Sequence, residues 1–168
     1  MIALLLAAWA VDGEGERIGE ELVRHAMDGR WKAVDDQYVR LIAAHPDEVT
    51  GEHHRLAAQA AQASGALMLA AQRLQRVTAA DPEHPAAARD LATLEQGTGL
   101  VMVAGRTLEA VQMPFAPELR EAVTAAVAEV DAHGRFVGLL PIGDYRVDGA
   151  TLQVVPGFRW QVLAPRRR

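Results

Sequence analysis

The sequence predicts an α+β protein, with helical hairpins in its first half and a small β-rich domain with one helix in its second. Two segments repeat the same helix and turn signals at a fixed offset, and after residue 97 short apolar segments replace the helical pattern. Near the end, an Asp-Gly pair between alternating segments marks a β-hairpin. Half of the residues are hydrophobic but only 5% are aromatic, a composition that suits closely packed helices.

The repeat is defined by glycines, aromatic or leucine residues, and prolines whose counterparts lie 36 residues apart (65 − 29). A glycine tolerates the left-handed backbone that ends a helix, and a proline cannot donate the next helical hydrogen bond. The first copy holds Gly29, Trp31, Tyr38 and Pro46, and the second holds Gly65, Leu67, Leu74 and Pro82. Apolar residues at helical spacing place helices at residues 16–27, 31–44, 52–63 and 67–80, and a capping helix at 85–95.

These two copies resemble the tetratricopeptide repeat, over residues 15–97. That family's pattern has a glycine between its two helices, an aromatic residue two positions later and a closing proline. Val34 departs from the pattern, because a small residue is expected there, and neither first helix carries the usual tryptophan. The period is also two residues longer than the usual length of about 34. The alternative is two unrelated hairpins that share these signals by chance.

The resemblance implies a non-enzymatic scaffold, which binds a protein or peptide along the first helix of each hairpin. In the second copy the candidate peptide-binding residues are Glu52, Arg55, Gln59 and Gln62, and the first copy offers Glu16, Glu20 and Val23. Arg55 is flanked by amides, which suits it to hold a peptide carboxylate through charge-assisted hydrogen bonds. The alternative is that these are ordinary solvated positions. Because two hairpins form a short array, we expect the second half of the chain or a partner to cover one of its ends.

The second half begins with the sequence Gly97-Thr98-Gly99, which we interpret as a hinge. Strands are expected over residues 100–104 and 107–113. Residues 117–132 follow helical spacing and open with a proline, which favours a helix, with a strand as the alternative.

A hairpin at Asp148-Gly149 is predicted to pair Val147 with Ala150. A second loop at residues 155–157 extends this hairpin into a C-terminal antiparallel meander, with Leu152 opposite Trp160. The register then places one set of apolar residues on a single buried face: Tyr145, Val147, Leu152, Val154, Phe158, Trp160 and Val162.

Residues 130–163 also resemble the carboxypeptidase regulatory-like and PEGA-type β modules. The match lies in an Asp131-x-x-Gly134-Arg-Phe sequence and in the later Leu140-Pro-x-Gly-x-Tyr145-x-Val sequence. The resemblance implies a non-catalytic surface or envelope module. Turn-forming and strand-forming residues that converged on the same pattern are the alternative.

By composition the chain divides into an apolar leader at residues 1–12, a helical repeat domain at 13–97, a small α+β domain at 98–165 and a basic tail at 166–168. The leader is shorter than the roughly 20 residues that span a bilayer. Its Ala8-Trp9-Ala10 sequence resembles a signal cleavage site, although no Lys or Arg precedes it. We therefore expect a periplasmic or secreted protein with no membrane span. A cytoplasmic protein whose leader is buried in the fold is the alternative.

Composition and spacing argue against several classes of function. A net charge of -5 argues against nucleic acid as a partner, and the absence of cysteine excludes disulfides and thiolate metal sites. The glycines at 13, 15 and 19 lack the spacing of a dinucleotide loop, and the single serine, Ser64, lies outside any GxSxG motif. The six histidines include no HExxH motif, and adjacent His53 and His54 point in different directions on a helix.

We therefore expect no catalytic, cofactor or metal site. The leading functional hypothesis is the peptide-binding scaffold. The second is an exported, envelope-associated accessory protein that docks through its C-terminal β module.

Overall fold

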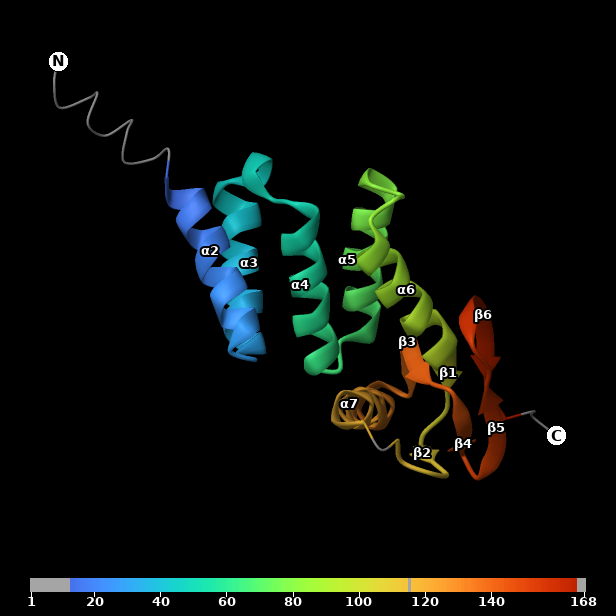
Figure 1. Cartoon of the computed structure of the whole chain (residues 1–168). Coiled ribbons are helices and arrows are strands. Elements are labelled where there is room, and N and C mark those ends of the chain that lie inside the picture. Colours follow the sequence, from blue (N-terminus) through green and yellow to red (C-terminus); the bar gives the residue numbers. More distant parts are fainter. Residues whose placement is uncertain (1–12, 115, 166–168) are drawn as a thin grey trace, which may run out of the picture.

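The computed structural model of the protein describes residues 13–114 and 116–165. The predicted leader at 1–12 and basic tail at 166–168 lie outside the described residues. The chain has the predicted α+β architecture, in which a helical array is followed by a smaller part with two sheets and one helix (Figure 1). Among the described residues, no helix combines the length and apolar character needed to cross a membrane.

The array consists of two helical hairpins and a fifth helix, as predicted. Each predicted helix boundary lies within two residues of the observed one. The helices are α2 (Glu14–Met27), α3 (Trp31–Ala44), α4 (Gly51–Ala63), α5 (Leu67–Ala80) and α6 (Pro85–Gly97). A short 3-10 helix, η1 (Pro46–Glu48), follows α3 at the proline that was expected to end it. Gly29 and Gly65 adopt positive φ angles of 68° and 75° between the paired helices, which explains why both turns use glycine.

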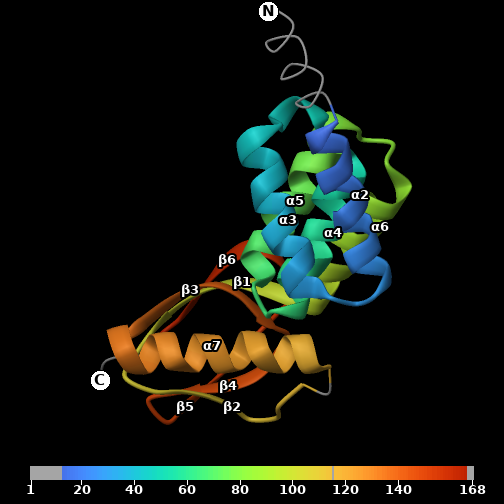
Figure 2. The same ribbon diagram turned by 90° about the vertical axis from the view of Figure 1, so that its left-hand side faces the viewer.

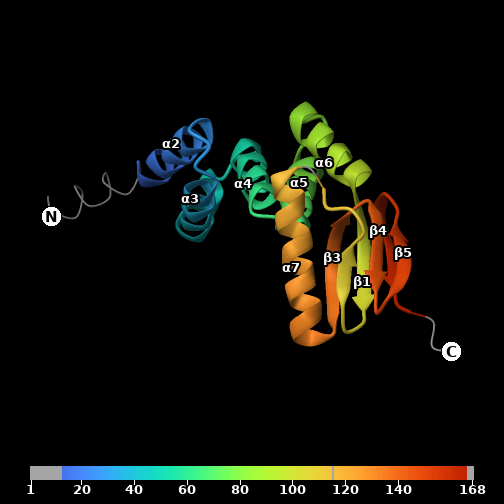
Figure 3. The ribbon, with the colours of Figure 1, turned by 90° about the horizontal axis from the view of Figure 1, so that it is seen from below.

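The second half contains two three-stranded sheets, ordered β3-β1-β6 and β2-β4-β5. Their strands are β1 (Thr98–Ala104), β2 (Leu108–Ala110), β3 (Arg135–Pro141), β4 (Gly143–Val147), β5 (Ala150–Val154) and β6 (Gly157–Leu163). Residues 117–133 form a helix, α7 (Pro117–His133), which decides between the two alternatives. It lies along one side of the sheets, and Val123, Ala126 and Val130 enter the core that the sheets enclose (Figure 3).

The Asp148-Gly149 hairpin has the predicted register, with Val147 opposite Ala150 and Tyr145 opposite Leu152. The predicted continuation into a meander is wrong. Strand β6 does not pair with β5 but runs parallel to β1, where Val162 lies opposite Met102. The backbone turns away at Gly157, whose φ is 113°, and the Gln161 side chain bonds both main-chain polar groups of Val155.

Because of this crossover, Trp160 and Val162 lie on a different sheet from Tyr145, and both are 63% exposed. The predicted single apolar face therefore does not exist. Buried Leu163 shows that β6 directs its other face into the core.

The predicted hinge at residues 97–99 is also wrong. Gly97 ends α6 and Thr98 begins β1 with no intervening loop. The Thr98 hydroxyl donates to the Leu94 carbonyl oxygen at 2.7 Å, and Gly99 is buried beneath the Val155 carbonyl oxygen. The helix therefore passes into the strand through a packed junction.

The second half of the chain covers one end of the array, as expected for such a short array. Ala122 of α7 and Leu139 of β3 belong to the same buried cluster as Ala58, Leu67 and Leu74. Figure 2 shows the β3-β1-β6 sheet beneath the array and projecting beyond it.

The two halves approach each other closely at Gly65. A Cβ atom added there would lie 2.6 Å from the backbone nitrogen of Ala122 and 2.8 Å from the carbonyl carbon of Glu121. At Gly29, the counterpart in the first hairpin, an added Cβ would meet nothing within 4 Å. The second turn thus rests directly on the α7 backbone.

This difference predicts unequal effects for two identical substitutions. Gly29→Ala should lower the free energy of unfolding by about 1 kcal/mol, because alanine is strained at positive φ. Gly65→Ala should cost about 1–3 kcal/mol more, since the α7 backbone must also shift. Urea denaturation of both variants measures the difference, and equal losses would contradict the close docking of α7.

Candidate functional site

Helices α2, α4 and α6 lie along one side of the array, whereas α3 and α5 lie along the other (Figure 3). Helix α2 contacts α4, and an ion pair joins α4 to α6. We call this side the α2–α4–α6 face. It carries two hollows, one lined by Glu16, Glu20 and Val23 and the other by Gln59 and Gln62. The candidates Glu52 and Arg55 line neither of them.

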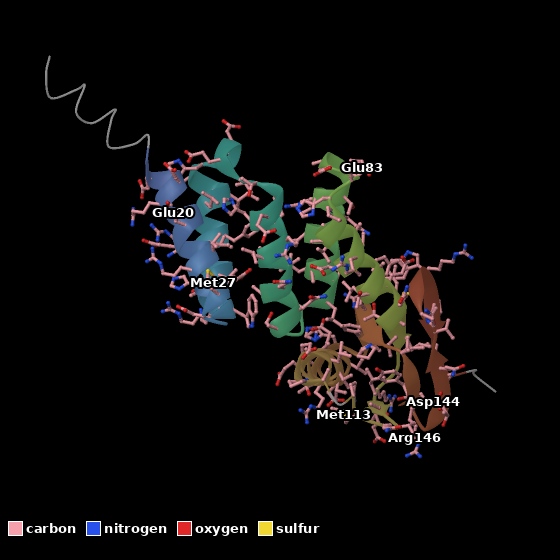
Figure 4. The ribbon with its side chains drawn as sticks, viewed as in Figure 1. Glu20, Met27, Glu83, Met113, Asp144 and Arg146 are labelled. Atoms are coloured by element: carbon pink, nitrogen blue, oxygen red, sulfur yellow. The ribbon has the colours of Figure 1, made fainter. Side chains whose placement is uncertain are left out.

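The first hollow, of about 470 Å³, lies between α2 and the start of α4. Glu16, Glu20 and Val23, the three candidates of the first copy, line it together with Glu48 and His53. Figure 4 shows Glu20 on α2. The helices approach closely here because α2 presents glycines toward this wall. A Cβ at Gly19 would lie 2.9 Å from the His53 ring, and one at Gly15 would collide with the Glu48 carboxylate.

The second hollow, of about 520 Å³, lies where α4 and α6 meet the start of α7. Gln59 and Gln62, one helical turn apart on α4, line it as half-buried amides. The remaining lining is largely apolar and comes from four other helices: Trp31, Leu67, Thr93, Leu94, Glu118 and Leu119 are among its residues. An apolar pocket with a few convergent polar groups is the usual form of a ligand site.

Arg55 lies between the two hollows and is already paired. Its guanidinium donates to Glu52 at 2.6 and 2.7 Å and to Asp90 of α6 at 3.3 Å. The hydrogen bond from Arg55 holds the pKa of Glu52 below its usual value, and the same bond raises the pKa of Arg55. With two carboxylates around it and only 18% of its side chain exposed, Arg55 joins α4 to α6. Its guanidinium is thus already neutralised by two carboxylates, and its role in holding a peptide carboxylate stays a prediction.

A buried charged network lies behind this face, between the hairpins. Arg73 of α5 is the one charged residue that is fully buried among residues 13–114 and 116–165, with 5% exposure. Its guanidinium lies 2.6 Å from the Asp35 carboxylate, donates to the Ala57 carbonyl oxygen at 2.6 Å, and sits 4.6 Å from the centre of the Tyr38 ring. The network therefore ties α5 to both α3 and α4.

Two histidines of α4 contact these features. The His53 ring Nδ1 accepts a hydrogen bond from the Thr50 backbone N–H, and the His53 backbone N–H donates to the Thr50 hydroxyl oxygen, which forms a capping box at the start of α4. The His54 ring lies 2.7 Å from the Tyr38 hydroxyl. Burial lowers the pKa of both histidines, and the positive charges of Arg76 and Arg73 lower that of His54 further.

Of the residues that line the second hollow, only the two amides were predicted as site residues from the sequence. In the sequence, Trp31 and Leu67 are recognisable only as positions of the repeat pattern. Glu118 and Leu119 belong to a helix more than fifty residues away along the chain. Arg73 was also missed, because a single arginine in a helix usually reads as an exposed residue. Its one sequence signal is its place beside Leu74, within the buried stripe of α5.

Within the described ranges 13–114 and 116–165, no group of three or more His, Cys, Asp or Glu side chains is arranged to hold a metal ion. Comparisons with protein-family models, curated proteins and solved structures find no match.

Replacing Arg73 should weaken the contact between the hairpins. Arg73→Met keeps much of the side-chain volume but removes the charge and the bond to Ala57, so we expect a loss of about 2 kcal/mol in the free energy of unfolding. Arg76→Met, three residues along and exposed, is the matched control and should change stability by less than about 0.5 kcal/mol. Urea unfolding measures both, and equal effects would contradict a structural role for Arg73.

Acidification should lower the free energy of unfolding through His53 and His54. Both have folded-state pKa values below the ordinary 6.5, so the unfolded chain binds protons first as the solution is acidified. Their contribution is present above pH 6.5 and is lost as the pH falls toward the folded-state values. We expect His54→Gln to show a shallower loss of stability than the wild type between about pH 7.5 and 5.5 in thermal unfolding. An unchanged slope would contradict it.

Proposed function

We propose that this protein is a non-enzymatic peptide-binding module of the tetratricopeptide type, which holds an extended segment of a partner protein on its α2–α4–α6 face. The observation that carries the proposal is the position of Gln59 and Gln62. Chosen from the repeat pattern alone, both line the larger of the two hollows on this face.

The second hollow supports a particular mode of binding. Amide side chains donate and accept hydrogen bonds, so Gln59 and Gln62 suit the N–H and C=O groups of an extended peptide backbone. The apolar surface of Leu67, Leu94 and Leu119 suits one buried hydrophobic side chain of the partner. Because α7 forms one wall, the C-terminal part of the chain is needed to complete the pocket.

The first hollow adds a preference of charge. Glu16 and Glu20 are exposed there beside Glu48, and Arg55 is neutralised by Glu52 and Asp90. The face is therefore acidic at its α2 end, and a segment with a basic residue on one side of its hydrophobic anchor would complement it.

The alternative function, docking through the C-terminal β module, is favoured by a different observation. The β3-β1-β6 sheet exposes large apolar side chains, including Trp160. Their position on another side of the molecule makes this a separate surface.

Selection from a random peptide library displayed on phage tests the proposed function. We expect peptides that combine a hydrophobic residue with a basic one and bind with a Kd in the micromolar range. Thr93→Lys places a long side chain in the second hollow and should weaken their binding at least about tenfold, and Gln62→Ala should weaken it by up to about tenfold.

The chain supplies a matched control for each variant. Thr124 of α7 is exposed like Thr93, and both hydroxyls bond the carbonyl oxygen four residues earlier at 2.9 Å. Thr124→Lys should therefore leave binding unchanged, as should Gln75→Ala on the exposed side of α5. The proposal fails if the library yields no peptide, or if the selected peptides bind Thr93→Lys as tightly as the wild type.

A further inference from the structure

The β3-β1-β6 sheet has one face that is only partly covered. At its base, Leu100, Leu139 and Phe158 pack against α5 and α6. Toward the other end, where the sheet projects beyond the array (Figure 2), four large apolar side chains are exposed: Val137 at 54%, Met102 at 41%, Val162 at 63% and Trp160 at 63%. We call this exposed part the shelf.

The shelf is continuous across the three strands. Val137 of β3 lies opposite Met102 of β1, which lies opposite Val162 of β6, and Trp160 is on the same face of β6. Four such side chains offer on the order of 400 Å² of apolar surface, which is within the range of the largest apolar patch on a typical monomer, a patch that is often functional. The opposite face of the sheet is buried, with Val101 and Val103 at 0% exposure.

The shelf meets the array at a corner. A hollow of about 380 Å³ lies there, lined by Met68, Leu69 and Gln72 of α5, Ala122 and Ala125 of α7, and Val137 of β3 among others. Leu69 is 39% exposed in this wall. A flat membrane surface does not enter such an inner corner, whereas a protein of complementary shape does.

The near absence of charged residues on the shelf favours a second copy of the chain as the partner. The chain carries a net charge of -5, yet Arg135 is the only charged residue among the strand positions on this face, and it lies at the tip. In a two-fold symmetric contact, residues near the axis meet their own copies, so charged residues there would repel. The centre of the shelf satisfies that condition, because Arg135 and the neighbouring Glu129 of α7 lie at its rim.

The area leads to the same partner. A stable interface buries about 800 Å² on each side, roughly twice what the shelf alone offers. If two copies are related by a two-fold axis, the shelf of one copy packs against the shelf of the other. The α5 side of each corner then contacts the tip of the other copy's shelf. This arrangement uses both surfaces of the corner, and the facing sheets would pack about 10 Å apart as in a β-sandwich.

We propose that a second copy of this chain occupies the corner, so that the protein is a symmetric dimer held by the shelf. The shelf lies on the α5 side of the array, away from the α2–α4–α6 face. Dimerisation and peptide binding are therefore separate properties, and either can fail without the other.

Sedimentation of the full chain tests the proposal. At about 100 μM the wild type should sediment with twice the mass of one chain. Val137→Asp should raise the dimer dissociation constant at least about tenfold, because it places two like charges in the contact. Val39→Asp on α3, where the valine is 52% exposed, is the matched control and should leave the dimer unchanged.

Cross-linking provides a second measurement that does not depend on how Val137→Asp folds. The chain contains no cysteine, so a single introduced thiol reports only its own surroundings. Met102→Cys should form covalent dimers with a short bismaleimide, and Val39→Cys should not. A wild type that stays monomeric at about 100 μM overturns the proposal, even if its shelf then holds a helix of another protein. The proposal is also overturned if Val137→Asp leaves the dimer intact and Met102→Cys does not cross-link. Equal loss of the dimer in Val137→Asp and Val39→Asp overturns it as well.

Discussion

The contact on which this structure most depends is the burial of the Arg73 guanidinium between the two hairpins. A charged group that leaves water must be compensated, and here the Asp35 carboxylate, the Ala57 carbonyl oxygen and the Tyr38 ring surround it. These partners belong to α3 and α4, so the arginine is satisfied in only one relative position of the hairpins. Apolar packing alone would tolerate sliding, because the facing side of α4 is mostly alanine. The small side chains allow the helices to pack closely, and the arginine fixes the relative position of the two hairpins.

The second hollow depends on a further contact, between the two halves of the chain. The turn at Gly65 rests on the backbone of α7, and this places Glu118 and Leu119 beside the end of α4. At Gly29, no such contact exists and no comparable wall forms. The two hairpins therefore have similar backbones but form different hollows. The first contributes an open, acidic hollow and the second contributes a pocket that α7 completes.

Local signals predicted what local interactions determine. Glycine and proline positions gave the helix boundaries, because the backbone at those residues restricts what can follow, and Asp148-Gly149 gave the register of β4 and β5. Strand β6 was assigned wrongly, since its alternating pattern is satisfied by either of two neighbours and the choice is made by β1, more than fifty residues earlier in the chain. Arg73 and the α7 wall were missed for the same reason. Of the candidate residues, Gln59, Gln62 and Glu20 line hollows, whereas Arg55 is neutralised by Asp90 of another helix.

The two proposed surfaces, the α2–α4–α6 face and the shelf, do not touch, but the position of one determines whether the other stays accessible in a dimer. The α2–α4–α6 face and the shelf lie on opposite sides of the array, so a dimer formed at the shelf leaves both peptide-binding faces open. Each face alone is small, because two hairpins provide room for only a short segment. A dimer presents two such faces at a fixed separation, and a partner with two suitable segments would gain affinity from the second without any new kind of contact. For so short an array, pairing at the shelf offers a route to tight binding that additional repeats provide in longer ones.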